Sequence, residues 1–193
     1  MLQHPQEQDA SLGTGRLAAL HFKNATFKIG LSWPSLAAAL GHPVEARRWA
    51  VLYLGSAKPH ALAAGREVLA LDRMGAALKD QDAALAEIEG VVILDGAWSQ
   101  AKALWWRNPW VLKCKRIVLA PRRPSRYGRL RREPRRDSLS TLEAAALALS
   151  RLEGKPEIET ALIASFDRLL ARYRASRRAA AAAKHAPEPG DSP

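Results

Sequence analysis

The sequence contains a single cysteine, Cys114, among its 193 residues. One thiol cannot form an internal disulfide, and it cannot supply the thiolate cluster of a structural zinc site. No apolar run is long enough to span a bilayer, and the first residues lack the charged segment and apolar run of a secretory signal. These absences favour a cytoplasmic protein that has no metal and does not cross a membrane.

Several common catalytic motifs are absent as well. The sequence has no Walker loop, and the GTG at 13–15 is too short to indicate a dinucleotide-binding fold. No order of serine, histidine and acid suggests a hydrolase. Four histidines lack the mutual spacing of metal ligands: His4, His21, His42 and His60.

Positive charge is what the sequence has in excess, with a formal net charge of +11. Residues 113–136 hold eleven lysines or arginines and one acid, so the rest of the chain sums to only +1. Prolines and a glycine interrupt this stretch, which is therefore neither a helix nor a tail. A solvated basic face is one explanation. We favour a surface that contacts nucleic-acid phosphates, because the charge is confined to one loop between apolar segments.

Short apolar runs alternate with helical patterns along the chain. Three runs rich in Val, Ile and Leu predict strands covered on both faces: 48–55, 91–95 and 116–120. Helical spacing predicts five helices: 34–40, 80–90, 98–106, 140–154 and 156–180. This alternation predicts an α/β protein with a parallel or mostly parallel sheet.

The helix expected at 140–154 has the clearest end signals. Ser140 can cap its first turn while Glu143 reaches back to the cap, and Gly154 can close the last turn. The chain length suits one domain, which we expect to cover residues 1–180. A disordered, basic and proline-rich tail is expected over residues 181–193.

Ligands of parallel sheets bind beyond the carboxyl ends of the strands. Three loops follow such ends here, after residues 54, 95 and 120, and we expect them to form one pocket. Asp95 lies at one of these ends. Its carboxylate could cap the helix that begins at 98, or it could act as a general base. Gly96 favours the second interpretation, because a residue without a side chain lets a ligand approach the backbone.

Four tryptophans lie close together in the sequence: Trp98, Trp105, Trp106 and Trp110. Neighbouring residues point in different directions on a helix, so Trp105 and Trp106 cannot both be buried against one sheet. We expect Trp98, which is close to the acid, to lie in the pocket and stack on a ring. The other three are interpreted as packing residues.

Several stretches of the chain together resemble the DTW-domain family, which is named for an Asp-x-x-Trp signature. The stretches are LDGAW, QAKAL..RNPW, RRPSRYGRLRREP and LSTLEA, with LQHP, Glu7 and GTGRL (13–17) resembling the family's opening. The resemblance covers about residues 2–155, and the motifs follow the family's order. By this resemblance the Asp-x-x-Trp pair is Asp95 and Trp98.

The better-known members of that family are tRNA-uridine aminocarboxypropyltransferases. The resemblance therefore implies transfer of the 3-amino-3-carboxypropyl group of S-adenosylmethionine to a ring nitrogen of a tRNA uridine. It also implies a SPOUT-like α/β sheet with flanking helices and a C-terminal trefoil knot that binds S-adenosylmethionine. The chain departs from the family at Ala97, where threonine is common, and in lacking an N-terminal cysteine cluster, so no metal is expected.

The pocket and the resemblance together assign roles to residues. Asp95 and Trp98 are the expected catalytic residues, Asp95 as base or as a group that orients the uracil, and Trp98 as a stacking platform. The residues expected to bind S-adenosylmethionine are Leu54, Gly55, Leu94, Gly96, Pro121, Arg126, Leu139, Ser140 and Thr141. Among these, Arg126 and the N–H groups of Ser140 and Thr141 would hold the carboxylate of the transferred arm. The expected tRNA contacts are Arg122, Arg123, Arg129, Arg131, Arg132 and Arg135.

Other functions stay open at this stage. A SPOUT-like RNA methyltransferase would share the fold and the donor but present the methyl group. A non-catalytic RNA-binding protein would keep only the arginine-rich loop at residues 122–136, called the basic loop below. Ribosomal RNA could replace tRNA as the acceptor.

Overall fold

The computed structural model of the 193-residue chain describes residues 1–52, 65–128, 130 and 138–184. Its strands form two sheets. The first has three parallel two-residue strands in the order β2-β1-β6: β1 Leu2–Gln3, β2 Lys28–Ile29 and β6 Leu94–Asp95. The second has the order β4-β7-β3-β5: β3 Trp49–Leu52, β4 Val68–Leu71, β5 Gly90–Val92 and β7 Lys115–Leu119. The predicted α/β class and the mostly parallel sheet are confirmed.

The strand predictions missed β1, β2 and β4 and joined two strands that are separate. β4 was missed, although its four residues are buried, and it runs antiparallel to β7 while the other pairs are parallel. The run 91–95 was expected to be one strand but is divided between β5 and β6. The division occurs because residues 90–92 pair with β3, whereas Leu94 and Asp95 pair with β1. One apolar run therefore connects the two sheets.

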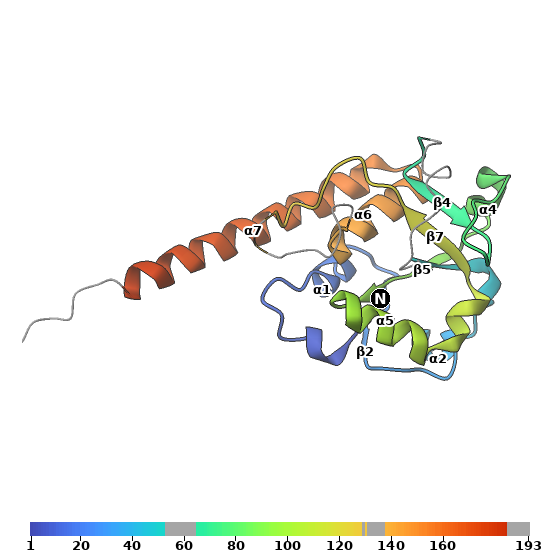
Figure 1. Ribbon diagram of the computed structural model, residues 1–193, viewed down its shortest axis with the longest axis horizontal. Helices are drawn as coiled ribbons and strands as arrows, with labels where there is room; N and C mark the ends of the chain where they lie inside the picture. The colour runs from blue at the N-terminus through green and yellow to red at the C-terminus, as the bar shows by residue number, and fades with distance from the viewer. Residues whose placement is uncertain (53–64, 129, 131–137, 185–193) are drawn as a thin grey trace, which may run out of the picture.

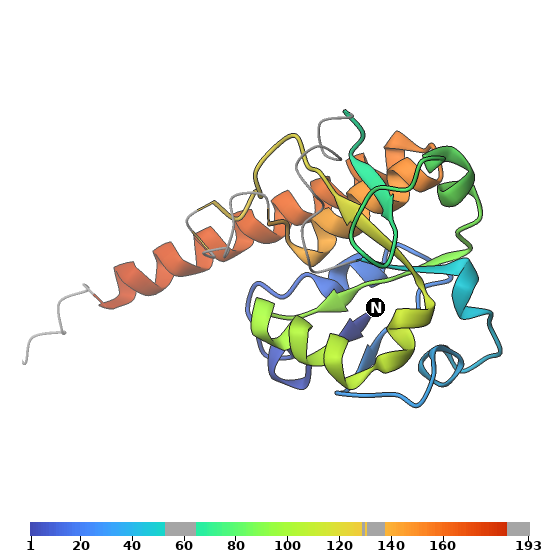
Figure 2. The same ribbon diagram turned by 45° about the vertical axis from the view of Figure 1, so that its right-hand side comes forward.

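Helices cover both sides of the sheets (Figures 1 and 2). The α-helices are α1 Gly15–Ala19, α2 Leu36–Leu40, α4 Gln81–Ala86, α5 Trp98–Arg107, α6 Thr141–Leu152 and α7 Pro156–Lys184. The described residues also form 3-10 helices at η1 Pro5–Glu7, η2 Ala46–Arg48 and η3 Pro109–Lys113. α6 and α7 lie on one side, and α5 and α2 lie on the other.

The helix predictions are largely confirmed, with shifted ends. α2 begins after Ser35, whose hydroxyl accepts a hydrogen bond from the N–H of Ala38. The helix expected at 80–90 ends at Ala86, because Gly90 already belongs to β5. α7 continues to Lys184, so the first four residues of the expected tail are helical, and residues 185–193 lie outside the described residues.

The two largest hydrophobic clusters of the described residues join helices to the sheets. On one side, Phe166 of α7 packs edge-on against Tyr127, with ring centroids 5.0 Å apart. The Tyr127 hydroxyl donates a hydrogen bond to the carbonyl of Leu12, 2.5 Å away, which ties the basic loop to the N-terminal segment. On the other side, Leu104 of α5 and Val111 are fully buried against β1 and β3. The N-terminal segment, the basic loop and α6 are thereby held in one region.

Asn108 organises the second cluster and gives a prediction that concerns stability alone. Its side-chain oxygen accepts hydrogen bonds from the N–H of Trp33 and the indole of Trp110, and its amide donates to the carbonyls of Leu31 and Leu104. Asn108→Ala removes these four bonds, although the Trp110 indole keeps its bond to the carbonyl of Trp33. We therefore expect the free energy of unfolding to fall by about 3 kcal/mol. Urea denaturation measures the change. A fall of less than about 1 kcal/mol, the usual net value of a single hydrogen bond, would contradict the prediction.

Candidate functional site

Asp95 ends β6 in a buried corner, with only 2 % of its surface exposed. One carboxylate oxygen, Oδ2, accepts a hydrogen bond from the side-chain amide of Gln3 at 2.7 Å. The other, Oδ1, accepts from the hydroxyl of Thr141 at 2.5 Å. Gln3 is the residue paired with Asp95 across the β1–β6 ladder, and Thr141 is the first residue of α6. The carboxylate therefore joins two strands to a helix N-terminus.

The GTG segment at 13–15 packs against the same corner. A Cβ atom on Gly15 would lie 2.2 Å from Oδ2 of Asp95, so only glycine lets α1 approach this closely. The hydroxyl of Thr14 accepts a hydrogen bond from the N–H of Leu142, which links the start of α1 to the start of α6. The resemblance had marked this segment only as a family motif. Its physical role is to permit close packing around Asp95.

The structure corrects the helix-cap interpretation of Asp95. The N-cap of α5 is Ala97, which has no side-chain acceptor, and the side chain of Gln100 accepts a hydrogen bond from the Ala97 N–H at 2.6 Å. Gly96 has a conformational role as well. Its φ of +154° favours glycine, and a Cβ atom there would lie 2.9 Å from Gln100. Gly96 therefore provides a turn against α5, and no ligand approach is needed to explain it.

The four tryptophan side chains differ in how exposed they are to solvent. Trp105 and Trp110 are buried, as expected for packing residues. Trp106 is 78 % exposed, so its interpretation as a packing residue is wrong. Trp98 is half-buried in the first turn of α5, and the ammonium of Lys102 lies 5.4 Å from its ring centroid.

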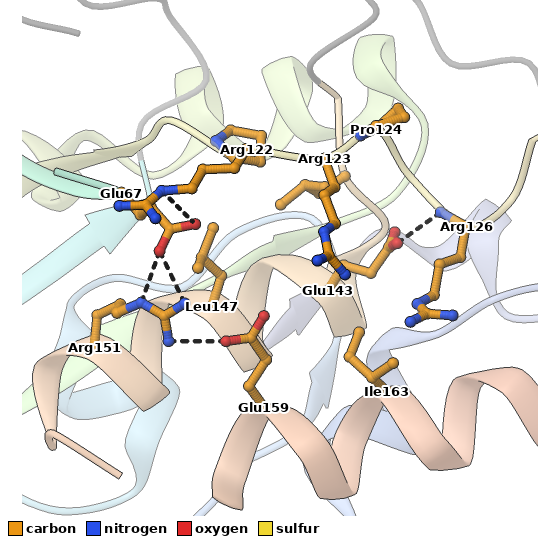
Figure 3. A pocket seen from close by; sticks show the side chains of 12 residues that line it. Glu67, Arg122, Arg123, Pro124, Arg126, Glu143, Leu147, Arg151, Glu159 and Ile163 are labelled. Atoms are coloured by element: carbon orange, nitrogen blue, oxygen red, sulfur yellow. Dashed lines mark hydrogen bonds and ion pairs between the residues drawn. The ribbon is translucent and has the colours of Figure 1, made fainter. Parts of the chain in front are cut away.

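A cavity of about 420 Å³ lies between the basic loop, α6 and α7 (Figure 3). Three residues expected to bind S-adenosylmethionine line it, namely Pro121, Arg126 and Leu139, together with two expected to contact tRNA, Arg122 and Arg123. The other described lining residues are Glu67, Pro124, Glu143, Leu147, Arg151, Glu159 and Ile163. Neither Asp95 nor Trp98 is among the described residues that line it.

Glu143 fixes the wall of this cavity. Its buried carboxylate accepts hydrogen bonds from the N–H of Arg126 at 2.7 Å, the hydroxyl of Ser125 at 2.7 Å and the N–H of Ser140 at 2.9 Å. The predicted capping box is thus confirmed and also holds the basic loop. It corrects the expectation that the Ser140 N–H binds a ligand carboxylate. That donor is already used, and the negative charge of Glu143 would repel a second anion there.

Most of the charged groups around the cavity are paired. The Arg126 guanidinium donates to both carboxylate oxygens of Asp167 on α7, at 3.0 and 3.1 Å, and therefore has a protein partner where a ligand carboxylate was expected. Arg151 bridges Glu67 and Glu159, at 2.9 and 2.8 Å. Arg122 lies 3.8 Å from Glu67.

Arg123 differs from these arginines. Its guanidinium points into the cavity (Figure 3), and it makes no ion pair with any residue that the structure describes. It is therefore a cation positioned for an anionic ligand group. The sequence could not distinguish Arg123 from the neighbouring arginines, because the direction of each side chain depends on where the folded protein anchors the basic loop.

The remaining expected site residues are dispersed or outside the described part of the chain. Leu94 is buried in the hydrophobic cluster beneath α5, and the Thr141 hydroxyl is engaged by Asp95. Six expected residues lie outside the described residues: Leu54, Gly55, Arg129, Arg131, Arg132 and Arg135. Gln3, Gly15 and Glu143 were not expected at the site. Only the capping box and the LQHP and GTGRL motifs marked their positions.

Cys114 does not belong to this site. It lies in the cluster beneath α5, where burial raises the pKa of its thiol to about 11. Over the described ranges, no cluster of three His, Cys, Asp or Glu side chains is arranged to hold a metal ion. Nor does any helix in the same ranges have the length and apolar character needed to cross a membrane.

The fold and this corner define an α/β protein with mostly parallel sheets, in which a buried aspartate secures the helix beside a basic cavity. The chain belongs to the DTW-domain family, whose model matches residues 1–174. It is 40 % identical over 73 residues to tRNA-uridine aminocarboxypropyltransferase 2 of Macaca fascicularis. The proteins of the same name from Drosophila melanogaster and Mus musculus are 37 % and 38 % identical over 73 residues. These segments cover 38 % of this chain but only 24–29 % of the relatives. No solved structure matches the chain.

Proposed function

We propose that this protein is a tRNA-uridine aminocarboxypropyltransferase, which moves the 3-amino-3-carboxypropyl group of S-adenosylmethionine to a ring nitrogen of a tRNA uridine. Membership of the DTW-domain family across residues 1–174 is the observation that carries the proposal. The name of the relatives, tRNA-uridine aminocarboxypropyltransferase 2, suggests the transferred group and the acceptor. The proposal extends that activity to a chain that aligns with only part of those proteins.

The cavity beside α6 suits the proposed donor. Its volume of about 420 Å³ lies within the usual range for small-molecule sites. Leu139, Leu147 and Ile163 offer apolar contact for a nucleoside, while charged groups of both signs suit the zwitterionic end of an amino acid. When bound, S-adenosylmethionine supplies a carbon activated by a sulfonium leaving group. The chain's contribution is to select which of three such carbons faces the acceptor.

Arg123 is our candidate for holding the carboxylate of the transferred arm. It points into the cavity without a described partner, whereas Arg126 is paired with Asp167. A guanidinium binds a carboxylate through two parallel hydrogen bonds, which would fix the direction of the arm. The arginines beyond residue 128 keep their expected role in holding the tRNA backbone.

Asp95 is assigned a different role from the one its sequence position suggested. Its burial and its bonds to Gln3 and Thr141 support a positioning role, in which it holds the start of α6 and therefore the wall of the cavity. Direct proton abstraction from the uridine is the alternative. Trp98, half-buried and close to Asp95 in the chain, is the proposed stacking platform for the flipped uracil.

A SPOUT-like fold with a C-terminal trefoil knot forms part of the proposal. The parallel strands β3, β5 and β7, followed by α6, support that arrangement. A crystal structure with bound S-adenosylmethionine tests it. A knotted chain with the donor in the cavity beside α6 is the expected result, and an unknotted chain or a donor bound away from that cavity would contradict the assignment.

The function is tested by incubating the protein with labelled S-adenosylmethionine and total tRNA, followed by mass analysis of the nucleosides. We expect uridine carrying the aminocarboxypropyl group. A methylated nucleoside would indicate the methyltransferase alternative, and binding of tRNA without transfer would indicate the non-catalytic one. Ribosomal RNA in a parallel reaction tests the other possible acceptor.

Arg123 and Arg126 form a matched pair of neighbouring arginines. Arg123→Gln removes the proposed charge-assisted bond to the donor, so we expect the KM for S-adenosylmethionine to rise roughly 10- to 100-fold with the KM for tRNA little changed. Arg126→Gln should change the donor KM much less, because that side chain binds Asp167. If Arg123→Gln raised only the KM for tRNA, Arg123 would be an RNA contact, as the sequence suggested.

A further inference from the structure

The last helix, α7, continues well beyond the body of the protein. Its first half is held by buried side chains, including Leu162, Phe166 and Leu170. After Tyr173, every described side chain up to Ala182 is exposed. Figures 1 and 2 show this part projecting away from the sheets and the other helices. Packing therefore explains the first half of the helix and not the second.

The charge of this segment is of one sign. Between residues 168 and 182 the sequence has no acid and five arginines: Arg168, Arg172, Arg174, Arg177 and Arg178. We call residues 168–182 the α7 arm. Arg168 and Arg172 are four residues apart and share one face of the helix, and Arg174 and Arg178 share another in the same way. Like charges at this spacing repel, and opposite charges normally accompany them on a solvated helix. An anion bound along the helix would reduce the repulsion between these arginines.

The α7 arm begins where the basic loop is anchored. The ion pair between Arg126 of the loop and Asp167 of α7, at 3.0 Å, lies immediately before the arm's first residue. The loop also carries Arg122 and Arg123, both exposed. The arginines of the arm, from Arg168 to Arg178, therefore extend the positive charge of the loop in one direction by about 15 Å, from a rise of 1.5 Å per residue.

We propose that the α7 arm is a second contact surface for the phosphate backbone of tRNA, which extends the surface of the basic loop. The identity of the RNA rests on the proposed function. An extended polyanion fits charges distributed along a projecting helix. A membrane surface fits poorly, because beyond Tyr173 the arm's only apolar side chains are alanines, which are too small to insert into a bilayer.

The test is tRNA binding by the full chain with Arg174, Arg177 and Arg178 all replaced by glutamine. Glutamine is also a good helix former, so the arm should stay helical, which circular dichroism can check. Loss of three phosphate contacts should reduce the slope of log K against log salt concentration by about 2 to 3. Replacement of the same three residues by lysine should leave the slope close to that of the unmodified protein.

A matched control removes the same net charge far from the α7 arm. The variant Arg47→Gln, Arg73→Gln, Lys79→Gln changes three exposed cations on other segments, and we expect it to leave the slope unchanged. An equal reduction by both triple variants would mean that only net charge matters. That result, or an unchanged slope for the α7 variant, would overturn the proposal.

Two further measurements separate the possible failures. If the α7 variant lost binding to anionic phospholipid vesicles and kept its tRNA binding, the arm would be a membrane contact and the proposal would be wrong. Because tRNA can bind without S-adenosylmethionine, the contribution of the α7 arm to tRNA binding is measured independently of catalysis. A protein that binds tRNA through the arm but transfers nothing would contradict the proposed function alone. If transfer is normal and tRNA binding does not depend on the α7 arm, only the proposal about the arm is contradicted.

Discussion

Replacing Asp95 by alanine is expected to reduce aminocarboxypropyl transfer by more than about 100-fold, a loss of roughly 3 kcal/mol of transition-state stabilisation. The variant removes the acceptor shared by Gln3 and Thr141. Each buried donor left unpaired costs about 1–3 kcal/mol, so the free energy of unfolding should also fall by about 2–5 kcal/mol. Nucleoside analysis and urea denaturation measure the two effects. Binding of tRNA should change little, because the arginines that carry it are elsewhere.

Asparagine at position 95 separates the two roles proposed for this residue. The amide of Gln3 can turn over and the hydroxyl of Thr141 can rotate, so both can still bond to an asparagine. If Asp95 is a positioning residue, Asp95→Asn should keep transfer within about tenfold of the unmodified protein. Thr141→Val should then lower transfer while leaving Asp95 charged. A folded Asp95→Asn protein as inactive as the alanine variant would instead identify Asp95 as the base.

Glu143→Ala is expected to have the second-largest effect. Its carboxylate holds the hydroxyl of Ser125 and the N–H groups of Arg126 and Ser140. Without it the helix loses its capping box and the loop loses its anchor, so stability should fall by on the order of 3–5 kcal/mol. The affinity for S-adenosylmethionine should fall at the same time, because the cavity wall is released. Isothermal titration with the donor measures that loss.

Two variants serve as controls for Glu143. Glu143→Gln keeps one acceptor oxygen and adds a donor that can bond to Ser125, so it should retain part of the stability and of the donor affinity. Ser125→Ala removes only one of the three bonds and should cost about 1 kcal/mol. Unchanged donor binding in a destabilised Glu143→Ala protein would show that this cavity is not the donor site.

The elements with strong local signals were predictable from the sequence. The α6 helix was expected from its capping box and from Gly154, and both are present. β7 was expected from its apolar residues and lies within one residue of its predicted bounds. The two-residue strands β1 and β2 were not predicted, because they are too short to show a period. Only their pairing defines them, β1 with both β2 and β6 and β2 with β1.

The amino-acid sequence by itself determined the α/β class, the concentration of charge in one loop and the family, because these depend on local periodicity, composition and ordered motifs. The tertiary structure decided what each charged group does. Asp95 is buried between Gln3 and Thr141, Arg126 is neutralised by Asp167 and Arg123 points into the cavity. Such partners are separated by up to 92 residues in the chain. No local pattern encodes these pairings, since they arise only when distant segments pack and desolvate each other.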